Sequence, residues 1–136
     1  MTHLIRLDDL VFVSPQILAE DMAELARHGV ALVVSHRPDE EEPGQPSFRE
    51  LEAAARDAGL RLIHAPVRGL PHDDAVAATA QALADASPDQ AVLLFCRSGM
   101  RSAAAWAMAR ARQGADSQAL RAAAADAGYD LSRVPL

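Results

Sequence analysis

The feature that most constrains the fold is a seven-residue segment that lies between an apolar run and an alanine-rich run. The segment, residues 96–102, reads Cys-Arg-Ser-Gly-Met-Arg-Ser and contains the only cysteine of the chain. Residues 91–95 before it are continuously apolar and have the length of a buried strand, whereas residues 102–112 after it favour a helix. The sequence therefore predicts a buried strand, a tight glycine-containing turn and a helix that begins at that turn.

This arrangement predicts an anion-binding loop with a reactive thiol at its mouth. Backbone N–H groups of such a turn point inward, and the helix N-terminus adds partial positive charge. A thiol at that position, beside two arginines, is expected to react as the thiolate. We therefore interpret Cys96 as a nucleophile and Arg101 as the residue that stabilises anionic forms. The rest of the loop is expected to bind the anion, namely Arg97, Ser98, Gly99, Met100 and Ser102. The alternative is a small core cysteine, which would not require two arginines and a glycine nearby.

Strand-like and helix-like segments alternate along the rest of the chain. Residues 5–13 predict a short strand pair at a sheet edge, and apolar runs predict strands over 30–34, 60–64 and 91–95. Helix start signals stand at Ser14, Ser47, Asp73 and Asp116, and Tyr129 and Leu131 are expected to fold back onto the body. The lengths suit right-handed crossovers. We therefore expect an α/β fold with a mainly parallel sheet of four to five strands and helices on both faces.

Other candidate side chains lie where ligands bind in parallel sheets, beyond the carboxyl ends of the strands. Arg37 follows a strand directly and either contacts an anionic substrate or braces the loop. Asp73 and Asp74 are general-acid candidates if the substrate is a phosphate, although stabilisation of a helix N-terminus is sufficient reason for them. The acidic run over 39–42 is interpreted as a solvated loop.

The composition narrows the class of protein. The chain has 136 residues, half of them hydrophobic, and a formal net charge of −6, which argues against a nucleic-acid partner. One cysteine excludes an internal disulfide, and no cysteine–histidine spacing resembles a zinc site, so neither a metal nor a cofactor is implied. The N-terminus lacks the apolar run of a signal peptide and no segment is long enough to span a bilayer. We therefore expect a single domain over 1–136 in the cytoplasm, without a membrane partner.

Three stretches together resemble a known family. The cysteine segment is similar to the active-site loop of rhodanese-like sulfurtransferases, in which four residues separate a cysteine from a closing arginine. With residues 12–16 and 37–46, it resembles the phosphatase-like or rhodanese-like domain of beta-lactamase hydrolase-like proteins, found alone or fused to persulfide dioxygenases in bacteria. The resemblance runs from about residue 10 to residue 112. It implies a dual-specificity-phosphatase-like fold, a site role for Arg37 and a persulfide dioxygenase as a partner.

The spacing in the loop favours sulfur over phosphorus chemistry. Tyrosine phosphatases have five residues between the cysteine and the arginine and a histidine before the cysteine, whereas four residues separate Cys96 from Arg101 and Phe95 precedes Cys96. A shorter loop makes a tighter cradle, which suits a sulfur atom carried on the thiol. We therefore predict a sulfurtransferase that moves sulfane sulfur from thiosulfate or a persulfide, through a Cys96 persulfide, to an external thiol or cyanide. The alternatives are a cysteine-dependent tyrosine or dual-specificity phosphatase and a thiol-based redox sensor.

Overall fold

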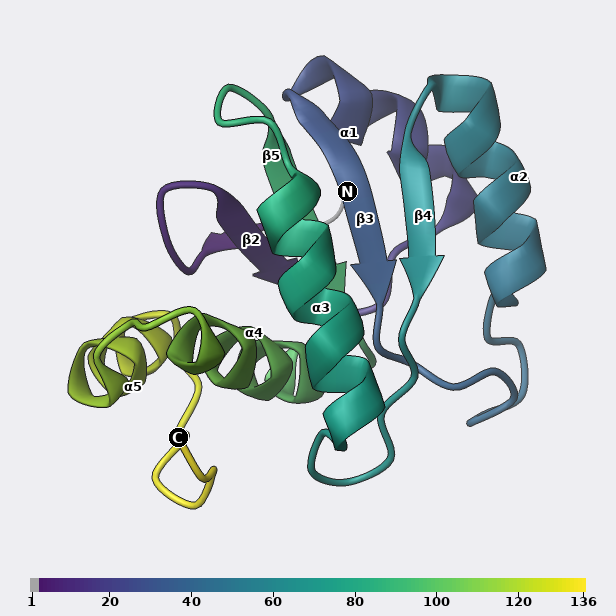
Figure 1. Ribbon diagram of the computed structural model, residues 1–136. Helices are drawn as coiled ribbons and strands as arrows, with labels where there is room; N and C mark the ends of the chain where they lie inside the picture. Colours follow the sequence, from purple (N-terminus) through teal and green to yellow (C-terminus); the bar gives the residue numbers. More distant parts are fainter. Residues whose placement is uncertain (1–2) are drawn as a thin grey trace.

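The computed structural model describes residues 3–136 and contains a five-stranded mixed sheet between two layers of helices (Figure 1). The strands lie in the order β1-β2-β5-β3-β4. Their bounds are β1 Ile5–Arg6, β2 Val11–Ser14, β3 Val30–Ser35, β4 Arg61–His64 and β5 Ala91–Phe95. β1 pairs with β2 in the antiparallel direction, and every other pairing is parallel. The expected α/β class with a mainly parallel sheet is confirmed.

Helices cover both faces of the sheet, as expected (Figure 1). On one face lie the short turn η1 and helices α1 and α2, with bounds Ala19–Asp21, Met22–Arg27 and Phe48–Ala58. On the other face lie α3, α4 and α5, with bounds Asp73–Asp85, Met100–Arg112 and Ser117–Asp126. Within residues 3–136, no helix combines the length and the apolar character that a membrane span needs.

The central strand β5 divides its side chains between two cores. Val92 and Leu94 belong to the cluster that packs under α3 and α4, whereas Leu93 and Phe95 belong to the cluster under α1 and α2. This division follows from the alternation of side chains along a strand. All four side chains are buried, which explains why the sequence of β5 is continuously apolar. The end of β5 is thereby fixed in the middle of the sheet, between β2 and β3.

Two of the predicted helix caps are present and one is wrong. The Ser47 hydroxyl accepts the Glu50 N–H at 3.1 Å, and the Asp116 carboxylate accepts the Ala119 N–H at 2.9 Å. Ser14, the third, is not a cap: it is the last residue of β2 and pairs with Phe95 of β5. No helix follows it directly: the helix α1 begins only at Met22, after the turn η1. Parallel pairing with β5 therefore outweighs the local capping signal of Ser14 and Pro15.

The C-terminal segment folds back onto the body, as predicted. Leu131 is 2% exposed, and the Arg121 guanidinium donates to the carbonyl oxygens of Leu131 and Val134. Tyr129 reaches the loop that follows β5, where its hydroxyl donates to the Ser98 carbonyl oxygen at 3.1 Å. Tyr129 thus joins the C-terminal segment to the cysteine segment.

Candidate active site

The cysteine segment forms the predicted turn between β5 and α4. Cys96 follows directly on β5, and α4 begins at Met100 with Gly99 as its N-cap residue. The Cys96 sulfur accepts the Gly99 N–H at 3.1 Å, so a backbone donor of the turn points at the sulfur. Cys96 has no exposed surface, so the prediction of a thiol at the mouth of the loop is wrong: the sulfur is buried beneath the turn. A buried sulfur at a helix N-terminus, held by a backbone N–H, is the arrangement that stabilises a thiolate or an anion bound to it.

Gly99 is required in this turn for two independent reasons. Its φ of +100° lies in the left-handed region, where an L-residue is strained. A Cβ atom built on Gly99 would also overlap the Tyr129 hydroxyl and lie 2.9 Å from the Tyr129 Cζ atom. Burial raises the pKa of Tyr129, and the negative charge of Cys96 raises it further, so the phenol is close to the sulfur. The sequence predicted that Tyr129 packs on the body, but it gave no signal of this position over the loop.

Arg101 lies beside Cys96 and is held by a carboxylate. Its Nη1 donates to Glu41 Oε2 and to the Val67 carbonyl oxygen, both at 2.8 Å, and its Nη2 donates to Glu41 Oε1 at 2.8 Å. The hydrogen bond with Glu41 is the largest cause of the raised pKa of Arg101, and the Cys96 charge contributes to the same direction. Arg101 therefore faces both the sulfur and the loop after β3.

Arg37, the other predicted site arginine, is 2% exposed. It braces the loop after β3 through three side-chain hydrogen bonds, which we call the brace. Its Nε donates to Glu41, its Nη1 to the Gln16 side chain and its Nη2 to Glu42, each at 3.0 Å. Glu42 also pairs with Arg97, the exposed arginine of the cysteine segment, at 3.4 Å. Of the two roles that the sequence left open for Arg37, these contacts correspond to bracing the loop.

The loop over residues 39–42 is exposed, as predicted. The sequence did not indicate, however, that Glu41 and Glu42 pair with arginines of the site. The pKa of Glu41 is lowered to about 2, chiefly by its hydrogen bond with Arg101 and then by that with Arg37, against the opposing effect of burial. The pKa of Glu42 is lowered mainly by Arg37. One sequence signal could have indicated these pairings. Several arginines follow strand ends that meet at one edge of the sheet, and arginines that lie close together need carboxylates beside them.

Below the loop, His36 links the cysteine segment to α3. Its ring nitrogens lie 2.8 Å from the Ser102 and Thr79 hydroxyl oxygens, and Thr79 donates its own proton to the Ala75 carbonyl oxygen. Thr79 must then accept from His36 Nε2–H, so the network assigns Nδ1 as the acceptor of the Ser102 hydroxyl proton. Burial lowers the pKa of His36 to about 3, and the charge of Arg101 contributes. A neutral histidine thus fixes the orientation of Ser102.

The two general-acid candidates lie elsewhere. Asp73 forms an ion pair with Arg112, the last residue of α4, and the Asp73 side chain is 87% exposed. Arg112 is eleven positions after Arg101 in the helix, roughly 16 Å at the usual rise. The carboxylate of Asp74 accepts the Ala75 N–H at 2.9 Å, at the start of α3. The structure places neither aspartate in the network of Arg101 and Glu41, and a general-acid role for them stays a prediction.

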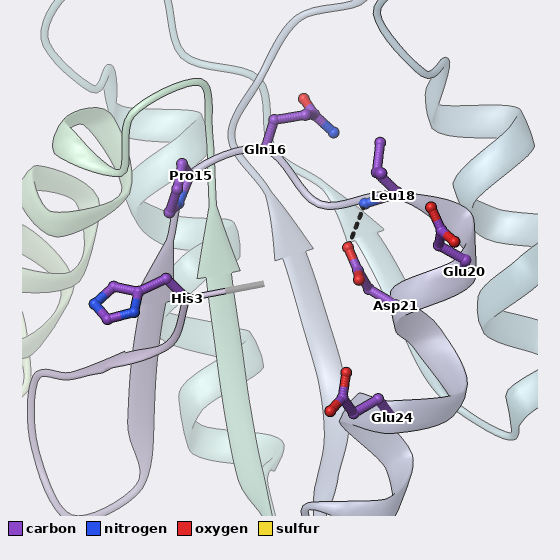
Figure 2. Close-up of a pocket in the computed structure, with 7 residues that line it drawn as sticks. All are labelled: His3, Pro15, Gln16, Leu18, Glu20, Asp21 and Glu24. Carbon is purple, nitrogen blue, oxygen red and sulfur yellow. Dashed lines mark hydrogen bonds between the residues drawn. The ribbon is translucent and has the colours of Figure 1, made fainter. Parts of the chain in front are cut away.

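A surface hollow of about 470 Å³ lies next to the brace and shares Gln16 with it (Figure 2). Gln16 connects the two because its side-chain oxygen accepts from Arg37 Nη1 at 3.0 Å. The Gln16 N–H also donates to the Arg97 carbonyl oxygen at 3.2 Å, which joins the hollow to the cysteine segment. The other lining residues are His3, Pro15, Leu18, Glu20, Asp21 and Glu24. Figure 2 shows the three carboxylates together on the side of η1 and α1, opposite His3 and Pro15.

Comparison with known protein families gives one match over most of the chain. Residues 4–115 match the family described as "Beta-lactamase hydrolase-like protein, phosphatase-like domain". Beta-lactamase hydrolase-like proteins of Xylella fastidiosa (strain 9a5c) and Agrobacterium fabrum are 31% and 29% identical over 113 and 111 residues. These alignments cover 82% and 81% of this chain, but the chain spans only about a quarter of each relative, 26% and 25%.

Solved structures of similar fold include several that are named phosphatases. A candidate phosphatase from Neisseria meningitidis, NMA1982, superposes with a TM-score of 0.80 at 29% identity, over 95% of this chain and 91% of that one. TpbA of P. aeruginosa in complex with pTyr superposes with a TM-score of 0.66 at 27% identity, over 94% and 75%. These matches favour the phosphatase alternative over the predicted sulfur transfer. Tyr129 lies beyond the residues that match the family.

Proposed function

The chain belongs to the family of phosphatase-like domains of beta-lactamase hydrolase-like proteins, and on this premise we propose that it is a cysteine-dependent phosphatase. The observation that carries the proposal is the Cys96 sulfur, held by the Gly99 N–H at the N-terminus of α4 with Arg101 beside it. The likeness to TpbA, a protein solved in complex with pTyr, supports a phosphate monoester as the substrate. The phosphatase alternative thereby replaces sulfur transfer as the first proposal.

In the proposed reaction, the Cys96 thiolate attacks the phosphorus atom of a phosphate monoester. The S–P bond forms as the P–O bond to the leaving group breaks, and the leaving oxygen takes a proton from solvent or from an acid. Water then attacks the phosphocysteine, which releases inorganic phosphate and restores Cys96. Backbone N–H groups of residues 97–102 and the Arg101 guanidinium stabilise the charge on the equatorial oxygens. Leaving groups of low basicity, such as nitrophenolate, need no general acid, so they suit the first assay.

Sulfur transfer remains the second candidate because one observation favours it. Only four residues separate Cys96 from Arg101. Such a short loop has room for one sulfur atom on the thiol, and the anionic persulfide would accept the same backbone donors. In this reaction Cys96 takes the outer sulfur of thiosulfate, releases sulfite, and passes the sulfur to an external thiol. A persulfide dioxygenase is the partner that this second reaction would imply.

The experiment compares both reactions in one set of variants. We expect wild-type protein to hydrolyse 4-nitrophenyl phosphate, Cys96→Ser to show only background rate, and vanadate to inhibit. Arg101→Lys should lower kcat/KM by about tenfold to a thousandfold, because an ammonium cannot reproduce the planar fork of guanidinium. Arg49→Lys, the same change at an exposed arginine of α2, serves as the matched control for Arg101→Lys.

Mass spectrometry of the protein after exposure to thiosulfate tests sulfur transfer against the phosphatase proposal. If wild-type protein gains one sulfur atom on Cys96 and transfers it to cyanide, yet leaves aryl phosphates intact, sulfur transfer replaces the phosphatase proposal. A protein that is oxidised once at Cys96 and turns over neither substrate would instead behave as a redox sensor.

A further inference from the structure

We propose that Glu41 is the positioning residue of this site: it holds the outer edge of the Arg101 guanidinium so that the inner edge is left for an oxyanion at Cys96. The inference rests on the proposed function, because the oxyanion is taken to be the transferred phosphoryl group. Glu41 comes from the loop after β3, sixty positions before Arg101 in the chain.

The count of donors on Arg101 supports this role. A guanidinium has five N–H groups, arranged as an outer edge formed by Nη1 and Nη2 and an inner edge formed by Nε and Nη2. Glu41 takes one N–H from each Nη, and the Val67 carbonyl oxygen takes the second N–H of Nη1. Among the contacts of the described residues, the Nε–H and the second Nη2–H donate to no oxygen acceptor. These two donors form one planar fork, which matches two oxygens of a phosphate. Arg101 also lies within reach of the Cys96 sulfur, because a hydrogen bond to Cys96 contributes to the raised pKa of Arg101.

Glu41 is itself held in place by the buried Arg37. Its Oε1 accepts from both Arg101 Nη2 and Arg37 Nε, so one carboxylate oxygen joins the two arginines. Arg37 is almost fully buried and is fixed by Gln16 and Glu42 through its other nitrogens. Arg37 therefore restricts the rotation of the Glu41 carboxylate, and the Glu41 carboxylate in turn fixes the orientation of the Arg101 guanidinium.

The loop that carries Glu41 is also fixed by its own hydrogen bonds. The Glu41 N–H donates to the Gln45 side-chain oxygen at 2.9 Å, and the Gln45 amide donates to the Pro38 carbonyl oxygen at 2.9 Å. Because the arginines lower the pKa of Glu41 to about 2, its carboxylate stays ionised at every pH at which a phosphatase would be assayed. Glu41 in this position is therefore an acceptor for Arg101 and not a proton donor for a leaving group.

The proposal is testable because a different role for Glu41 would change phosphate affinity in the opposite direction. If Glu41 occupied the site as a stand-in for the substrate anion, its neutralisation would free Arg101 and strengthen phosphate binding. If Glu41 positions Arg101, its neutralisation loosens the guanidinium and weakens phosphate binding. Glu41→Gln suits the test because glutamine keeps the size of the side chain but offers only one acceptor oxygen.

The experiment measures hydrolysis of 4-nitrophenyl phosphate and, by calorimetry, binding of inorganic phosphate. For Glu41→Gln we expect kcat/KM to fall by about tenfold to a hundredfold, the scale of a misplaced catalytic group, with a parallel loss of phosphate affinity. Glu40→Gln is the matched control: it removes the same charge from the same loop, and the exposed Glu40 side chain has no ion pair among the described residues. Circular dichroism and urea midpoints confirm that each variant is folded.

A double-mutant cycle separates positioning from a purely structural effect. In an Arg101→Ala background, Glu41→Gln should change kcat/KM by less than about twofold, because the residue through which it acts is gone. A merely structural role would cost the same in both backgrounds. Equal losses in the two backgrounds, unchanged kinetics in Glu41→Gln, or tighter phosphate binding would each overturn the proposal.

The two readouts also separate this inference from the proposed function. If wild-type protein hydrolyses no aryl phosphate but binds inorganic phosphate, the phosphatase proposal fails, and weaker binding by Glu41→Gln still supports the positioning role. If wild-type protein binds no phosphate, both proposals fail, because there is then no oxyanion site for Arg101 to serve.

Discussion

Replacing Gly99 with alanine should expose the contact between the loop and the C-terminal segment. The change adds one methyl group at φ +100°, against the ring of Tyr129. Holding a non-glycine residue at such a φ costs about 1 to 3 kcal/mol. The methyl group also displaces Tyr129, which loses the hydrogen bond to the Ser98 carbonyl oxygen, worth about 0.5 to 1.5 kcal/mol. We expect a total loss of about 1.5 to 4.5 kcal/mol.

Gly114→Ala provides a matched control for the backbone cost alone. Gly114 has a φ of +96°, and a Cβ atom there would meet nothing within 4 Å. Urea unfolding followed by the fluorescence of Trp106, the only tryptophan, reports the free energy of unfolding for each variant. Gly99→Ala should cost at least about 0.5 kcal/mol more than Gly114→Ala, the lower bound for the lost hydrogen bond.

A second background completes this test. In Tyr129→Ala protein the obstructing ring is absent, so Gly99→Ala should cost no more than Gly114→Ala does. If Gly99→Ala costs the same with and without the Tyr129 ring, the two residues are not in contact and the reasoning is refuted.

Two further predictions concern the support of the site and a helix cap. Burial lowers the pKa of His36 in the folded protein to about 3, from the ordinary histidine value of 6.5. As the pH falls from about 6.5 to about 3, the unfolded chain therefore binds a proton before the folded chain does, and stability should fall. Urea unfolding across this range should show a smaller pH-dependent loss of stability in His36→Gln than in wild-type protein. Equal slopes in the two proteins would contradict a buried neutral His36. Ser47→Ala removes the side chain that accepts the Glu50 N–H and should lower the free energy of unfolding by about 1 kcal/mol, and an unchanged urea midpoint would show that the cap contributes nothing.

The parts of the site that local sequence determines were predictable. The strand, the glycine turn and the helix N-terminus around Cys96 are encoded within about twenty consecutive residues, and each has its own local signal. The caps at Ser47 and Asp116 were predictable for the same reason, since the acceptor and the donor lie three residues apart. Ser14 has an equally good local signal, but its pairing with β5 is non-local and overrides it.

The partners of the loop were not predictable because they are distant in sequence. Glu41 and Arg101 are sixty positions apart, and nothing in an acidic run indicates which of its members will face an arginine. Tyr129 meets Ser98 across thirty-one positions, and its phenol has no motif that marks it. Asp73 is a further example, because its ion pair with Arg112 depends on how α3 packs against α4. In each case the pairing is decided by packing, which a single sequence does not encode locally.

The orientation of His36 has a consequence for proton transfer at the sulfur. The only hydroxyl proton of Ser102 is donated to His36, and the low pKa of His36 prevents this ring from taking up another proton near neutral pH. Arg101 is fully protonated, and Glu41, with a pKa of about 2, is too weak a base. None of these four side chains can therefore take up a proton that leaves Cys96 near neutral pH. We expect that proton to pass to solvent or to a bound substrate, and to return from one of them.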